Sequence, residues 1–175
     1  MEKIDTSRTC PKEKPRTAGN FLKAFLFYFV QWTWGLPVNL VGGIFFLYSV
    51  LFKKRKWQHF GYSYIVYIPW KSGALTLGIF IFMRSDHPKK DWSYNTRIHE
   101  YGHTWQCLIL GPLYYIVIAV PSMIWCNCFR NYREKNNVSY YSLYCEGWAN
   151  SFGEYFSKMK MTYKFFINGN RDKNE

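Results

Sequence analysis

The chain has 175 residues, of which 49% are hydrophobic and 22% aromatic. This length fits one domain, and the composition excludes an intrinsically disordered chain. Its 23 lysines and arginines outnumber 11 acidic residues, and the net charge of +12 indicates an anionic partner, either nucleic acid or a lipid surface.

The two ends of the chain differ in composition from its middle. Residues 1–20 are polar and rich in lysine and arginine, and we expect a flexible basic N-terminal arm. Residues 161–175 predict a polar C-terminal tail, which leaves a single membrane-embedded domain over 21–160. No cleavable signal peptide is expected, because the polar N-terminal stretch contains acids and no small-residue cleavage site follows it.

Two long stretches of the domain contain no charged residue. One separates Lys23 from Lys53, and the other runs from Tyr101 to Phe129 with His103 counted as neutral. A membrane helix needs about 20 mostly apolar residues, so both stretches are long enough to be membrane segments. The alternative is a pair of buried helices in a soluble protein.

The first uncharged stretch is interrupted by Gly35-Leu36-Pro37. It is therefore either one kinked span or a shallow re-entrant hairpin. The basic run over 53–56 follows it, and the residues before it are basic too, which favours a cytoplasmic position for both flanks. Because the basic residues border the apolar stretches instead of lining one element with interleaved aromatic residues, we expect no nucleic-acid partner.

Residues 60–83 are typical of β-structure. The segments 62–68 and 74–82 are β-branched and aromatic, and Lys71-Ser72-Gly73 lies between them. This pattern predicts a β-hairpin, and a third membrane helix is the competing interpretation.

Helices are predicted after this hairpin. One extends over about 93–110, because Asp91 and Ser93 are good N-cap residues and Gly111-Pro112 is a strong stop signal. The remaining elements are an apolar helix up to about Phe129, a basic polar loop over 130–137 and a last helix over 139–158.

The helix over 93–110 contains the sequence His-Glu-Tyr-Gly-His. Histidines at positions i and i+4, here His99 and His103, lie on one helix face and can bind one Zn²⁺. Glu100 lies beside them and can accept a proton from metal-bound water, the arrangement of metallopeptidases. The alternative is that the two histidines form hydrogen bonds inside a helical bundle.

A third protein ligand is needed, with one position left for water. A metzincin would have Gly at 106 and His at 109, but Gln and Ile occupy these positions. Glu146 on the last predicted helix is the best candidate, ahead of Glu134 and Glu154. Asn150, one turn after Glu146, could accept the outer N–H of a ligating histidine.

The tetrahedral oxyanion of peptide hydrolysis needs a further donor. Candidates are Tyr140, Tyr141 and Tyr144, just before Glu146, and Arg97; spacing alone does not select one. We also expect the segment 74–82 to be an edge strand that binds an extended substrate.

These residues resemble a known family. The His-Glu-x-x-His motif at 99–103 and the pattern from Glu146 to Gly153 (E-x-x-A-N-x-x-G) resemble the gluzincin peptidases. More closely, His99–Gln106 (HEYGHTWQ), Gly111–Tyr114 and Trp148–Asn150 resemble a group of small bacterial membrane proteins over about residues 60–155. Among the gluzincins, the resemblance is greatest to the membrane-embedded branch of CAAX-type prenyl proteases and heat-shock membrane proteases. That branch usually has Asp where this chain has Asn150.

The resemblance implies a mainly α membrane protein with a zincin-like helical core and a β-hairpin before the active helix. It implies a zinc-dependent metallopeptidase of the bacterial cytoplasmic membrane that acts on a peptide or membrane protein, with Glu100 as general base. The alternative is a catalytically inactive, zinc-stabilised membrane scaffold or partner-binding protein.

Overall fold

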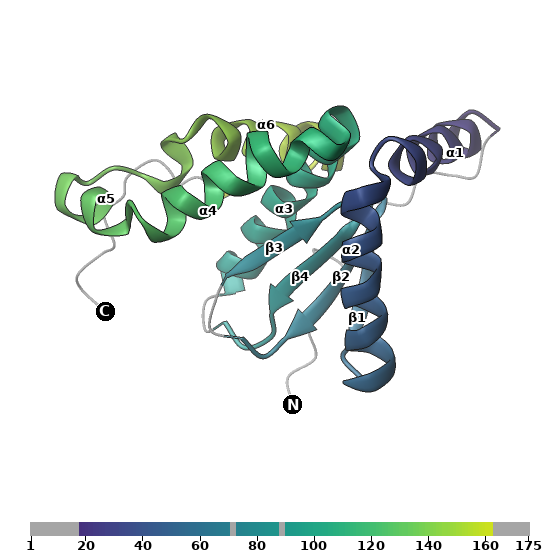
Figure 1. The fold of residues 1–175 in the computed structure, drawn as a ribbon, viewed down its shortest axis with the longest axis horizontal. Coiled ribbons are helices and arrows are strands. Elements are labelled where there is room, and N and C mark those ends of the chain that lie inside the picture. Colours follow the sequence, from purple (N-terminus) through teal and green to yellow (C-terminus); the bar gives the residue numbers. More distant parts are fainter. Residues whose placement is uncertain (1–17, 71–72, 88–89, 163–175) are drawn as a thin grey trace.

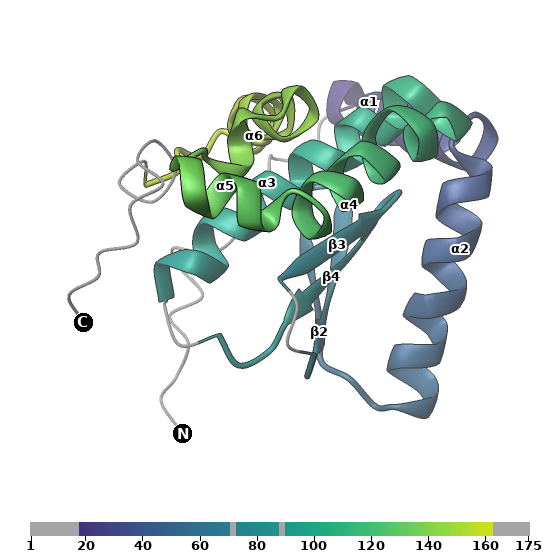
Figure 2. The same cartoon turned by 60° about the vertical axis from the view of Figure 1, so that its left-hand side comes forward.

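The computed structural model describes residues 18–70, 73–87 and 90–162. A small β-sheet lies between helix α2 (Leu36–Leu47) on one face and helix α3 (Lys90–Leu110) on the other, and helix α6 (Tyr144–Ser157) packs on α3 (Figures 1 and 2). Most of the predicted arm and tail lie outside the described residues. The last three residues assigned to the arm are helical, because α1 (Ala18–Thr33) begins there.

The first uncharged stretch forms two helices. Helix α1 and the continuous unit of α2 and a π-helical segment (Tyr48–Phe52) are bent by 94° at the break. Pro37, in the first turn of α2, and Gly35 account for the bend. At this bend the buried side-chain amide of Asn39 donates hydrogen bonds to the backbone carbonyls of Gln31 and Gly35, at 2.8 and 3.0 Å.

The sheet has the strand order β1-β2-β4-β3, and β3 is therefore an edge strand. Strands β1 and β2 are antiparallel, β2 and β4 are parallel, and β3 and β4 are antiparallel. The strands are β1 (Trp57–Phe60), β2 (Ser63–Ile68), β3 (Ala74–Leu77) and β4 (Phe80–Arg84).

A hairpin precedes helix α3, but the strand pairing predicted for it is wrong. The segment 74–82 is two strands, because Gly78 has a φ of +67° and the chain reverses there. The hairpin therefore joins β3 to β4, and β2 pairs with β4 in parallel. Both faces of β4 are covered: Phe80 and Phe82 belong to the cluster on the α2 side, and Ile81 and Met83 to the cluster that contains Ile98 of α3. This double burial explains the continuous apolar run in the sequence.

After α3 the chain turns at a 3-10 segment (Gly111–Leu113) and continues through a π-helical segment (Tyr115–Ala119) into α4 (Val120–Asn127). The predicted loop over 130–137 is wrong, because α5 (Arg130–Asn136) is helical. An ion pair between Arg130 and Glu134, one turn apart, supports this helix, and Asn137 ends it in the left-handed conformation. Helix α6 begins at Tyr144, later than predicted, because Ser139 and the extended Leu143 hold a separate 3-10 turn before it.

No single helix among the described residues combines the length and apolar composition of a membrane span. Two bent pairs pass the length and composition test when taken together: Gly19–Thr33 with Leu36–Phe52, and Asp91–Leu113 with Tyr115–Asn127, the second bent by 117°. They correspond to the two uncharged stretches.

Candidate metal centre

The site lies where helices α3 and α6 cross at unusually short range. A Cβ atom on Gly102 of α3 would lie 1.8 Å from the carbonyl oxygen of Ala149, and one on Gly153 of α6 would lie 2.0 Å from that of Ile98. Only glycine permits these backbone contacts. The crossing brings the segment from Ile98 to Gly102 of α3 against the segment from Ala149 to Gly153 of α6.

The variant Gly102→Ala should lower the free energy of unfolding by about 1–3 kcal/mol, because the added methyl group forces the two helices apart. Gly19→Ala is the matched control, since nothing lies within 4 Å of its Cβ position on α1. This control should be neutral or slightly stabilising. Chemical denaturation of the metal-free proteins measures both changes, and equal stabilities of the two variants would contradict the packing argument.

Three ligand atoms converge at this crossing. Glu146 Oε2 lies 3.0 Å from His99 Nε2 and 3.6 Å from His103 Nε2, and the two histidine nitrogens are 3.1 Å apart. All three residues are buried, and their ligand atoms form a group that could hold a metal ion. Ligands at 2.0–2.1 Å from a tetrahedral zinc ion are about 3.3 Å from each other, so the triad has the size that zinc requires.

The outer nitrogens of both histidines face amide oxygens. His99 Nδ1 lies 2.7 Å from Asn150 Oδ1, and His103 Nδ1 lies 2.6 Å from Gln106 Oε1. An amide oxygen only accepts, so each Nδ1 carries a hydrogen, and in a neutral ring Nε2 then offers a lone pair to the centre of the triad. Two lone pairs and a carboxylate oxygen at such distances repel one another unless a cation lies between them.

Glu146 is fully buried, and its Oε2 has no hydrogen bond of acceptable geometry. Burial by itself raises the pKa of this carboxyl group, but the rings of His103 and His99 outweigh it and hold the pKa well below the ordinary value. The carboxylate is therefore ionised. A buried carboxylate oxygen without a hydrogen bond is costly, and a bound cation removes that cost.

Glu100 is also buried but is not part of the ligand group. Its Oε2 accepts a hydrogen bond of 2.6 Å from Thr76 Oγ1 on the edge strand β3. The same hydroxyl lies 3.1 Å from the backbone oxygen of Glu100. The strand thus fixes the orientation of this carboxylate, which belongs to the residue next to His99 in α3.

The rival acids are placed elsewhere. Glu134 pairs with Arg130 on the exposed helix α5. Glu154 accepts a hydrogen bond from the backbone N–H of Met161 at 2.8 Å and pairs with Lys160, so it stabilises the end of α6.

The candidate oxyanion donors lie in different surroundings. The ring of Tyr141 packs edge-on against that of His99, with centroids 5.2 Å apart, whereas the exposed Tyr144 donates its hydroxyl to the backbone oxygen of Val117. Arg97 precedes His99 by two residues on α3, which is about 200° around the helix. The side chain of Arg97 therefore leaves the helix on the face opposite to that of His99.

Tyr140 is the remaining tyrosine, and its hydroxyl lies 2.9 Å from Ser122 Oγ. Burial raises the pKa of both Tyr140 and Tyr141, so both hydroxyls stay protonated and able to donate.

Sequence reasoning missed Gln106 and Thr76. Gln106 lies one turn after His103 on the same face of α3, and that spacing could have revealed it. Thr76 belongs to a distant strand, and nothing in its local sequence indicates a contact with Glu100.

The chain matches no family model, no curated protein and no solved structure. Its function is therefore inferred from the geometry of this site.

Proposed function

We propose that the protein is a gluzincin-like zinc metallopeptidase. The proposal rests on two features: three buried residues of the types that bind zinc lie together, and the next residue after His99, Glu100, is a fourth buried polar residue. A structural zinc site uses four protein ligands, whereas a catalytic one uses three and keeps a position for water. His99, His103 and Glu146 would supply the three, and Glu100 would act on the water.

Zinc at this triad would supply a Lewis acid that lowers the pKa of its bound water toward about 7. The carboxylate of Glu100 would accept the proton of that water and later pass it to the leaving amine. Thr76 holds one oxygen of that carboxylate and so sets its orientation. Tyr141, against the ring of His99, is the best-placed candidate donor to the developing oxyanion.

The edge strand β3 supports a peptide as the substrate. An exposed strand edge pairs with an extended peptide through main-chain hydrogen bonds. Thr76 lies on this strand and contacts Glu100, and its backbone oxygen accepts a hydrogen bond from the Tyr114 hydroxyl. A peptide that displaced this hydroxyl and paired along β3 would pass close to Glu100. The substrate would be a peptide or a segment of a membrane protein.

Comparative peptidomics of cells that carry the wild type or Glu100→Gln tests this proposal. A substrate should accumulate uncleaved only in the variant cells. Identical peptide pools in both cell lines would argue against hydrolysis.

The second candidate function is that of a zinc-stabilised membrane scaffold. The low exposure of all three ligands and of Glu100 favours it, because a closed site suits a structural metal. On this reading the Glu100→Gln cells keep the cellular role of the protein intact.

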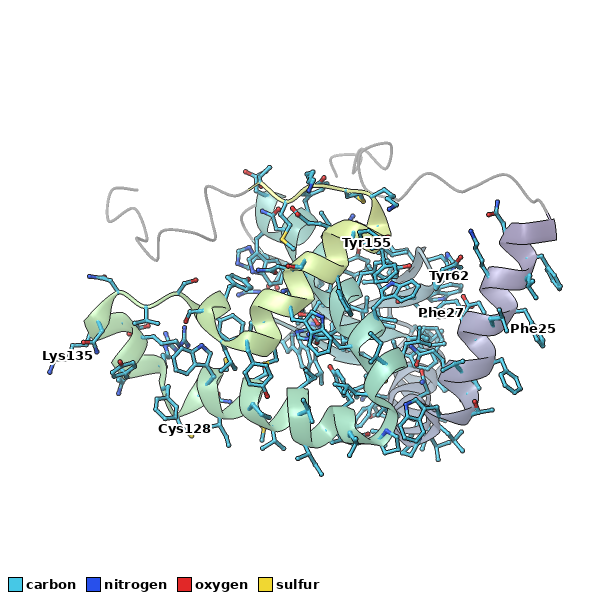
Figure 3. The ribbon with its side chains drawn as sticks, turned by 90° about the horizontal axis from the view of Figure 1, so that it is seen from above. Phe25, Phe27, Tyr62, Cys128, Lys135 and Tyr155 are labelled. Atoms are coloured by element: carbon cyan, nitrogen blue, oxygen red, sulfur yellow. The ribbon has the colours of Figure 1, made fainter. Side chains whose placement is uncertain are left out.

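We further propose that the protein is an integral protein of the bacterial cytoplasmic membrane. Helix α1 carries a stripe of exposed phenylalanines, Phe21, Phe25 and Phe29, at 55–76% exposure. Figure 3 shows Phe25 pointing away from the body of the molecule, while Phe27 points inward to Tyr62. Such a stripe is typical of a surface that another apolar phase covers.

The positions of the basic residues support a lipid bilayer as the apolar phase that covers this surface. The basic run over 53–56 follows the π-helical end of the α2 unit, where Leu51 and Phe52 are exposed. Elsewhere in the chain, helix α5 begins at Arg130, which directly follows the exposed Phe129. Basic residues beside exposed apolar ones suit the acidic headgroups of a bilayer.

Removing part of the α1 stripe should weaken membrane binding. The double variant Phe25→Gln with Phe29→Gln should float with vesicles of phosphatidylglycerol at least about tenfold less than wild type, since each buried phenylalanine contributes about 1.5–3 kcal/mol. Tyr155→Gln is the control, because Tyr155 is 65% exposed but lies on α6, away from α1 (Figure 3). Equal flotation of both variants would show that the stripe does not contact lipid.

A further inference from the structure

We infer that Gln106 is a positioning residue for the metal centre, and this inference rests on the proposed zinc site. Gln106 lies on α3 one turn after His103, and its side chain is fully buried. It makes two hydrogen bonds, one to a ligand and one to the helix that carries another ligand.

The orientation of the Gln106 amide is determined by its surroundings. Its Nε2 donates to the backbone oxygen of Cys145 at 2.8 Å, so its Oε1 must face His103 Nδ1, 2.6 Å away. The reversed amide would place N–H groups against the ring nitrogen and an oxygen against a carbonyl oxygen. His103 therefore carries a hydrogen on Nδ1, which leaves Nε2 as the nitrogen that can bind a metal ion.

The second bond connects the two ligand-bearing helices. Cys145 immediately precedes Glu146 in the first turn of α6, so Gln106 links His103 directly to the backbone beside the third ligand. Fixing both the ring and the helix before the metal arrives reduces the ordering that binding requires. Asn150 holds the ring of His99 through a single contact of the same kind, at 2.7 Å.

Gln31 offers a matched control for this role. It is as fully buried as Gln106, and its amide donates to the backbone oxygen of Thr104 on α3 at 3.0 Å. Its Oε1 accepts from Asn39, not from a ligand. Gln31 lies on α1, so the variant Gln31→Met removes a comparable buried amide that contacts α3 without removing a contact of His103.

The test is the dissociation constant of zinc, measured by competition with a chelator on the purified full chain. Gln106→Met should weaken zinc binding by about 10- to 100-fold. Gln31→Met should leave it unchanged, and Gln106→Glu, which keeps an acceptor at Nδ1, should bind more tightly than Gln106→Met. The inference is overturned if Gln106→Met binds like wild type, if Gln31→Met loses as much, or if Gln106→Glu gives no recovery.

A second measurement uses the wild type and does not depend on the folding of any variant. In zinc-loaded protein with ¹⁵N-labelled histidine, NMR should show His103 with its hydrogen on Nδ1 and the metal on Nε2. The reverse assignment would refute the role of Gln106 and leave the zinc site standing. A wild type that binds no zinc would instead refute the proposed function together with this inference.

Discussion

The purified protein is expected to contain about one zinc ion per chain and to lose it in each of the variants His99→Ala, His103→Ala and Glu146→Ala. Each substitution removes one of three ligand atoms that lie within 4.8 Å of one another. Two remaining protein ligands hold zinc far more weakly than three. Metal analysis by mass spectrometry, on protein purified in detergent without chelator, measures the content.

Glu154→Ala is the matched control for Glu146→Ala. Both carboxylates are buried on α6, but Glu154 bonds to the backbone of Met161 and not to the histidines. Its variant should keep the metal even if it is less stable. Metal-free wild type, or loss of zinc in the control alone, would show that the triad is not a zinc site.

Added zinc should also stabilise the wild type against heat and leave the three ligand variants unaffected, because only a folded triad binds the ion. This comparison separates loss of the site from loss of the fold.

The second large effect concerns Glu100. Glu100→Gln should retain zinc and lose peptide hydrolysis by at least about 100-fold, because an amide cannot take a proton from water. The substitution keeps the shape of the side chain, and Thr76 can still donate to the amide oxygen, so the site should stay in place. Cleavage of a peptide pool by zinc-loaded wild type and variant, followed by mass spectrometry, measures the difference.

The outcomes of this comparison are distinct. A variant that cleaves like wild type would show that the proton acceptor is another group. A variant that loses zinc would make Glu100 a ligand, which its absence from the ligand group argues against. If neither wild type nor variant cleaves and both bind zinc, the scaffold becomes the better explanation.

Much of the helical structure could be predicted from local signals. Gly111 and Pro112 end helix α3 as expected, and the two uncharged stretches overlap the two bent helix pairs. The strand pairing was not predictable in the same way, because β2 and β4 are parallel and the pairing depends on contacts distant in the sequence. The charge pattern over 130–137 predicts a loop, but an ion pair one turn apart and a left-handed cap stabilise the helix α5.

The sequence by itself determined which two histidines could bind one metal ion. The spacing of His99 and His103 places both on one helix face with Glu100 beside them, since a helix has 3.6 residues per turn. Only the tertiary structure decided which acid joins them. Gly102 and Gly153 let α6 approach α3 so closely that Glu146 reaches both rings, whereas Glu154, two turns further along the same helix, bonds elsewhere. The reason is physical: helical spacing is a local property, but a distance between helices depends on how their surfaces pack.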